Sequence, residues 1–119
     1  MYHYETIKEY LLPHRFRSAG EIYTKMLSQN HTADLLTHLA TGNLTHETYE
    51  HILTGKDRLE ETLEHLAEQG IIRIQYGKPS TSWFDLHARS ENRTVPTYAR
   101  FEEAKLPIPP PQSQPALYA

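Results

Sequence analysis

Residues 56–76 read KDRLEETLEHLAEQGIIRIQY, and this stretch contains two different periodicities. Its first part carries Leu59, Leu63 and Leu66, whose spacing of four and three places side chains on one face of an α-helix. Gly70 follows, and glycine is the residue type that most often ends a helix. After it, apolar and polar residues alternate as in a β-strand. The stretch therefore predicts a helix from Lys56 to Gln69 that leads directly into a strand over residues 71–76.

A second strand is predicted shortly after the first. Residues 77–80, Gly-Lys-Pro-Ser, have the composition of a turn, and residues 82–86 contain Trp83 and Phe84. Together the two strands would form a β-hairpin immediately after a helix. The competing interpretation is an α-helical bundle in which the hairpin is incidental.

Four further helices are expected before residue 56. Their start signals are a capping box at Ser18 and Glu21 and the possible N-caps Thr32 and Thr45. Pro13, Gly42 and Gly55 are the predicted stops of the first, third and fourth helices. The expected ranges are residues 4–12, 18–27, 32–41 and 45–53.

The whole chain has the size of one domain, with 119 residues, 38% hydrophobic residues and 23% charged residues. It lacks cysteine, which excludes disulfides and thiolate metal sites. No apolar run is long enough for a membrane helix, and the N-terminus does not resemble a signal peptide, so we expect an intracellular, cytoplasmic protein. Residues 102–119 hold five of the eight prolines and are expected to form a proline-rich tail after a domain over residues 1–101.

The leucine-rich helix, Gly70 and the following hairpin resemble the winged helix-turn-helix superfamily over about residues 31–87. This resemblance implies a mainly α fold with a small β-hairpin. The specific architecture would be a winged helix-turn-helix with extra N-terminal helices. It places residues 45–53 as the second helix, residues 56–69 as the recognition helix and residues 77–82 as the tip of the wing. It also implies binding of double-stranded DNA, as a transcriptional regulator or accessory factor.

Charge is distributed unevenly, which bears on where DNA would be contacted. Residues 31–70 carry two basic and eight acidic residues, whereas residues 71–101 carry five basic and two acidic ones. A phosphate-binding surface is therefore expected after residue 70, or near His14-Arg15-Phe16-Arg17. The predicted DNA contacts are the start of the recognition helix and the wing: Lys56, Arg58, Thr62, Arg73, Lys78, Ser80, Thr81 and Arg89.

The acidic residues of the predicted recognition helix argue against its insertion into a groove of DNA. A step of 100° per residue puts four carboxylates opposite the leucine stripe, and phosphates repel carboxylates. The alternative function is a protein–protein interaction module that uses this acidic face against a basic partner. The simplest interpretation is a solvated helix face. The residues concerned are Asp57, Glu61, Glu64 and Glu68.

Other chemistry finds little support in the sequence. His46 and His51 are five residues apart and point in different directions on a helix, so they cannot share a metal ion. We predict no metal, no cofactor and no enzymatic activity. Aromatic residues in the first two helices are candidates for a homodimer or partner surface, although some must belong to the core. These aromatic residues are Tyr2, Tyr4, Tyr10, Phe16 and Tyr23.

Overall fold

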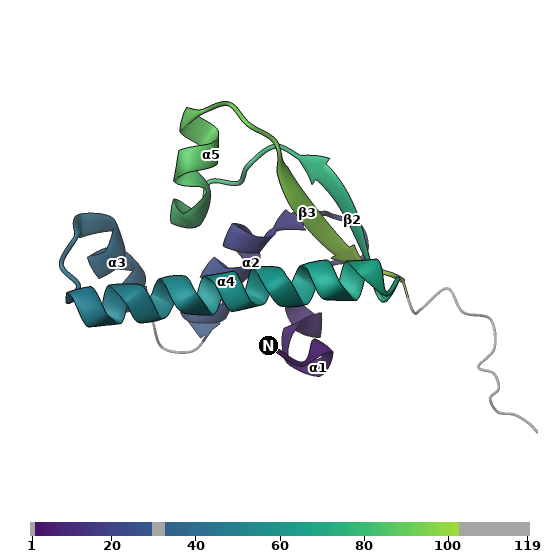
Figure 1. The fold of residues 1–119 in the computed structure, drawn as a ribbon, viewed down its shortest axis with the longest axis horizontal. Helices are drawn as coiled ribbons and strands as arrows, with labels where there is room; N and C mark the ends of the chain where they lie inside the picture. The colour runs from purple at the N-terminus through teal and green to yellow at the C-terminus, as the bar shows by residue number, and fades with distance from the viewer. Residues whose placement is uncertain (1, 30–32, 103–119) are drawn as a thin grey trace, which may run out of the picture.

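The computed structural model describes residues 2–29 and 33–102, and the mainly α fold with a small β element is confirmed there (Figure 1). Helix α4 runs along the length of the molecule, with α3 at its N-terminal end and the sheet at its C-terminal end. Within the described ranges no helix combines the length and the apolar composition that a bilayer crossing requires. The elements are α1 (Tyr4–Ile7), η1 (Lys8–Tyr10), β1 (Arg17–Ser18), α2 (Ala19–Gln29), α3 (Ala33–Thr41), α4 (His46–Glu68), β2 (Ile72–Gly77), η2 (Trp83–Asp85), α5 (Leu86–Ser90) and β3 (Val95–Arg100).

Helix α4 is continuous, so the predicted break at Gly55 between two helices is wrong. Thr45 caps it as expected, because its side chain accepts a hydrogen bond from the backbone N–H of Thr48 at 3.2 Å. At the other end Gly70 has a φ of +75°, and the backbone N–H of Ile71 donates to the carbonyl of Leu66 at 2.9 Å. These bonds satisfy backbone groups at both ends of a 23-residue helix.

The predicted partner of the first strand is also wrong. Residues 83–85 form a 3-10 turn and residues 86–90 the short helix α5, whereas β2 pairs antiparallel with β3. β1 pairs with the other side of β3, so the sheet order is β1-β3-β2. The turn begins locally, because the Ser82 hydroxyl accepts from the backbone N–H of Phe84 at 3.1 Å. Residues 78–94, here called the β2–β3 loop, therefore replace the predicted tight turn.

The N-terminal helices follow their predicted signals. The Ser18 hydroxyl accepts from the backbone N–H of Glu21 at 3.1 Å and begins α2. The first predicted helix is present as α1 followed by the 3-10 turn η1, and it ends before Pro13. Helix α3 ends at Gly42, which has a φ of +76°. Its predicted cap Thr32 and most of the proline-rich tail, residues 103–119, lie outside the described residues.

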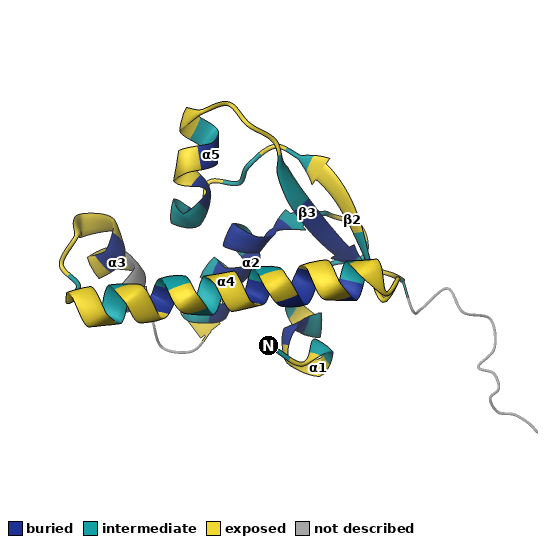
Figure 2. Cartoon of the chain, in the orientation of Figure 1, coloured by how far each residue is buried: buried dark blue, intermediate teal, exposed yellow. Residues whose placement is uncertain are grey.

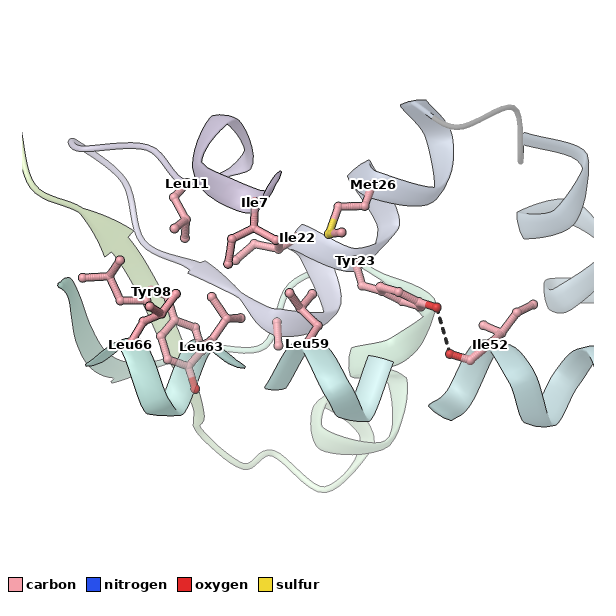
Figure 3. Close-up of a cluster of buried hydrophobic side chains, with 12 residues drawn as sticks. Ile7, Leu11, Ile22, Tyr23, Met26, Ile52, Leu59, Leu63, Leu66 and Tyr98 are labelled. Carbon is pink, nitrogen blue, oxygen red and sulfur yellow. Dashed lines mark hydrogen bonds between the residues drawn. The ribbon is translucent and has the colours of Figure 1, made fainter. Parts of the chain in front are cut away.

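The core lies where α4 meets α2 and the sheet (Figure 3). Figure 2 shows buried and exposed patches alternating along α4, as one inward face of a helix requires. The predicted stripe Leu59, Leu63 and Leu66 is buried, and Tyr98 of the central strand β3 packs into the same cluster. The sheet therefore contributes to the core, which contradicts the interpretation of an incidental hairpin.

Candidate nucleic-acid interface

The base of the β2–β3 loop is anchored by a buried carboxylate. Asp85 is 5% exposed, and its Oδ2 accepts from the Ser18 hydroxyl at 2.6 Å, the Ser80 hydroxyl at 2.7 Å and the Ser80 backbone N–H at 2.8 Å. A buried carboxylate is tolerated when such donors surround it. The three bonds tie the loop to the junction of β1 and α2.

Close backbone approach completes this junction. A Cβ at Gly20 would lie 2.4 Å from Oδ1 of Asp85, so only glycine fits at this position of α2 without displacement. The Ser82 hydroxyl lies 3.1 Å from the carbonyl of Gly20, to which it donates, and 2.7 Å from the Thr24 hydroxyl. The start of α2 and the base of the loop therefore form one packed unit.

Two of the predicted DNA contacts, Arg89 and Ser80, form hydrogen bonds within this unit. Arg89 donates to the carbonyl of Ser80 and, at 2.7 Å, to the carbonyl of Ser82. The Ser80 hydroxyl is bonded to Asp85 and also accepts from the backbone N–H of Ser82 at 3.1 Å. Arg89 and Ser80 hold the loop in shape through these bonds, and their contact with phosphates stays a prediction.

The side chains of Arg73 and Thr62 likewise form hydrogen bonds within the protein. The Arg73 guanidinium donates to the carbonyl of Pro13 and lies 5.0 Å from the Phe16 ring centroid and 5.8 Å from that of Phe101. Thr62 is 1% exposed, and its hydroxyl accepts from the Tyr2 backbone N–H at 2.9 Å. The burial of Thr62 argues against its contact with DNA, whereas the contact predicted for the half-buried Arg73 stays a prediction.

The predicted start of the recognition helix lies in the middle of α4. Lys56 is paired with Glu60 at 2.8 Å, whereas Arg58 is exposed. Because α4 begins ten residues earlier, at His46, neither cation lies near a helix terminus. The four acidic residues of the alternative function, Asp57, Glu61, Glu64 and Glu68, are all exposed, as predicted.

Lys78 and Thr81 remain exposed, and they line a groove at the outer side of the loop base. This basic groove has a volume of about 570 Å³ and is also lined by Arg15, Lys25 and Trp83. The tertiary structure thus brings the two sequence regions expected to bind phosphate, near Arg15 and after residue 70, to one surface. Lys25 was missed because a single lysine on a helix has no distinguishing sequence signal.

Most of the aromatic residues proposed for a dimer surface are packed inside this chain. Tyr23 is buried and donates to the carbonyl of Ile52 at 3.0 Å, and burial raises the pKa of its phenol to about 12. Tyr2, Tyr4 and Tyr10 pack against the core cluster, and Phe16 faces the Arg73 guanidinium. Tyr23 therefore cannot serve as a partner surface in this fold.

Comparisons with known proteins add no family to this description. A scan against models of protein families, a search of curated proteins and a search of solved structures each found no match. Across residues 2–29 and 33–102, no group of three histidine, aspartate or glutamate side chains is placed to hold a metal ion. The candidate site is consequently defined by its cations and its shape.

Proposed function

We propose that this protein binds the backbone of double-stranded DNA through the basic groove, as an accessory factor or regulator with little sequence readout. The observation that carries the proposal is the convergence of Arg15, Lys25 and Lys78 on one groove from three separate segments. Lys25 and Lys78 form no ion pair with any described residue, whereas Arg15 is paired at 3.1 Å with Glu21, which also lines the groove. Proteins bind the phosphates of DNA with unpaired lysine and arginine side chains and with hydroxyl groups that donate hydrogen bonds.

The anchored loop supports the same proposal. Lys78 and Thr81 flank Ser80, which is fixed by Asp85, and Arg89 holds the carbonyls of Ser80 and Ser82. A surface whose geometry is set before binding loses little conformational freedom when a partner docks. Thr81 can then donate its hydroxyl to a phosphate beside the Lys78 ammonium.

The resemblance to winged helix-turn-helix proteins gives independent support. Helix α4 ends at Gly70 and leads into β2, and the β2–β3 loop follows where the wing of that superfamily would lie. The structure differs from that superfamily in one respect, because the predicted second helix and recognition helix are the single helix α4. The proposed binding mode differs from the usual one in another. The exposed carboxylates of α4, such as Glu61 and Glu64, would repel phosphates, so the loop base and not α4 would approach the duplex.

Fluorescence anisotropy on a labelled mixed-sequence duplex tests the proposal, at about 50 mM and about 200 mM salt. Three phosphate contacts predict a loss of affinity of about fortyfold between the two salt concentrations. Lys78→Ala and Lys25→Ala should each weaken binding and reduce the salt slope by about 1. Lys56→Ala is the matched control, because it removes the same charge from a side chain that is paired with Glu60.

Three outcomes would contradict the proposal. The first is the absence of binding by folded protein at the lower salt concentration. The second is a control variant, Lys56→Ala, that loses as much affinity as Lys78→Ala. The third is an equal loss in Arg58→Ala, which would transfer the contact from the basic groove to α4.

A second candidate function is supported by a separate observation. The carboxylates of Asp57, Glu61, Glu64 and Glu68 are all exposed, and none forms an ion pair or side-chain hydrogen bond with a described residue. We propose as the alternative that this acidic face docks on a basic protein. The double variant Glu61→Lys and Glu64→Lys should then abolish capture of the partner, whereas stronger nonspecific DNA binding would place that face against DNA. Unchanged behaviour in both assays would exclude both roles for the face.

A further inference from the structure

Tyr98 combines a packed ring with a hydroxyl that forms no hydrogen bond with any described residue. The residue is 1% exposed and belongs to the core cluster. Figure 3 shows its ring beside Leu63 and Leu66 and its hydroxyl directed away from the cluster. Among the described residues nothing accepts from or donates to this hydroxyl. The fully buried side-chain polar atoms without a partner among the described residues are Arg17 Nε and Arg73 Nε, so the Tyr98 hydroxyl reaches accessible space beside it.

A cavity of about 330 Å³ lies at this position, between α4 and the β2–β3 loop. Tyr98 lines it together with Glu60 and Glu64 of α4. Phe84, Ala88 and Val95 supply apolar surface to the same cavity. Its volume falls at the lower end of the range of small-molecule sites, which is about 300–1,000 Å³. The cavity and the basic groove share Ser18 alone among their lining residues.

Most of the charges around the cavity are already compensated. Lys56 is paired with Glu60 at 2.8 Å, and Arg93 and His87 are both paired with Glu91, at 2.5 Å and 3.0 Å. Asp85 also lines the cavity, but its Oδ2 accepts three hydrogen bonds from Ser18 and Ser80. The Glu64 carboxylate has no ion pair with a described residue.

Two carboxylates of α4, those of Glu60 and Glu64, line the cavity together with the Tyr98 hydroxyl. Burial raises the pKa of this phenol, and the nearby carboxylates of Glu64 and Glu60 raise it further. The hydroxyl is therefore protonated at neutral pH, and its oxygen remains available as an acceptor. The Glu64 carboxylate and the Tyr98 hydroxyl oxygen are thus the acceptors left open to a ligand, and an unpaired carboxylate attracts a cation and repels an anion.

We propose that this cavity binds a small aliphatic ammonium compound. Its ammonium group would donate to the Glu64 carboxylate at the mouth and to the Tyr98 hydroxyl oxygen inside. Its hydrocarbon part would lie against Phe84, Ala88 and Val95. This site is independent of DNA binding, because the cations that carry the proposed function line the other groove.

Three four-carbon probes that differ in charge test the proposal on the full chain: putrescine, 1,4-butanediol and succinate. Backbone amide shifts in two-dimensional NMR would be followed during titration with each probe. Putrescine should shift the amides of Glu64, Ala88 and Val95 in a saturable manner, and the other two probes should not. Glu64→Gln should weaken putrescine binding about tenfold, since a hydrogen bond between charged groups is lost.

Two further variants separate the site from general attraction to an acidic protein. Tyr98→Phe keeps the buried ring and removes only the hydroxyl, and it should weaken binding several-fold. Glu61→Gln is the matched control, because it removes the same charge from α4 at a residue that does not line the cavity. Its affinity for putrescine should stay within about twofold of the wild-type value.

The proposal is overturned if putrescine gives no saturable shifts in the cavity. It is equally overturned if Glu61→Gln weakens binding as much as Glu64→Gln, which would indicate nonspecific attraction. Saturable binding of succinate or butanediol with similar affinity would refute the assignment to a cation.

Discussion

The hydroxyl of Tyr23 lies against the backbone of α4 at Gly55, in the space where any other residue would carry its Cβ. A Cβ at position 55 would stand 2.3 Å from that oxygen. The hydroxyl donates to the carbonyl of Ile52 at 3.0 Å, and the Tyr2 hydroxyl donates to the carbonyl of Gly55 at 3.3 Å. One glycine inside a long helix thus allows two tyrosines from the N-terminal segments to bond directly to its backbone.

Gly55→Ala should destabilise the protein although alanine is the better helix former. The Tyr23 ring packs edge-on against Phe84 at a centroid distance of 5.2 Å, so it cannot easily withdraw from an added methyl group. We expect a loss of about 1–3 kcal/mol in the free energy of unfolding, measured by urea denaturation. Adding Tyr23→Phe, which removes the clashing oxygen, should restore part of the loss. A stabilised Gly55→Ala protein would contradict the close approach.

Alkaline pH should unfold the protein partly through Tyr23. Burial raises the pKa of this phenol from 10.0 to about 12 in the folded state. Between these values the folded state binds more protons than the unfolded state, so the free energy of unfolding falls as pH rises from about 10 to about 12. The contribution of Tyr23 is fully present below pH 10.

Urea denaturation at a series of pH values measures this dependence. The wild-type protein should lose more stability than Tyr23→Phe over this range, by up to about 2 kcal/mol. The variant should still show some loss, because burial also raises the pKa of Tyr98. Parallel curves for the two proteins would show that Tyr23 does not contribute.

Asp85→Ala should loosen the base of the β2–β3 loop. The substitution leaves the Ser18 hydroxyl, the Ser80 hydroxyl and the Ser80 backbone N–H without their acceptor. We expect a cost of about 2–4 kcal/mol together with faster amide hydrogen exchange in the loop. Glu91→Ala is the matched control, since this carboxylate of the same loop is exposed and its removal should leave stability almost unchanged. Equal effects of the two substitutions would refute the role of Asp85.

Arg89→Ala should lower stability and leave the salt dependence of DNA binding almost unchanged. Its guanidinium holds two loop carbonyls, so we expect a cost of about 1–3 kcal/mol. Arg93→Ala serves for comparison, because this arginine pairs with the exposed Glu91 and should matter little to stability. Thermal unfolding and anisotropy on the same samples would separate the two effects. A lower salt slope with unaltered stability would return Arg89 to the DNA contacts.

Local sequence signals determined much of the secondary structure. The stripe of Leu59, Leu63 and Leu66 predicted the buried face of α4, and the caps Ser18 and Thr45 fixed where two helices begin. These signals are readable because a helix periodicity and a cap depend on residues a few positions apart. The first strand was predicted to within one residue, since β2 is an edge strand that carries an alternating pattern.

The second strand could not be found in the same way. β3 is the central strand, and Thr97, Tyr98 and Ala99 are all buried, so the alternation that marks a half-exposed strand is absent. Pro96 is a further signal against a strand at this position, because proline cannot donate a hydrogen bond to a neighbouring strand. Trp83 and Phe84 instead suggested a strand where the chain forms a 3-10 turn.

The sequence by itself determined the helical face of α4, its end at Gly70 and the uneven distribution of charge. Only the tertiary structure decided that Gly55 is a site of close packing and that Arg73 and Arg89 are held by backbone carbonyls, whereas Lys25 and Lys78 remain open. The physical reason is the range of the interactions. Periodicity and net charge are properties of neighbouring residues, but the partner that occupies a glycine's free space or a cation's donors comes from elsewhere in the chain.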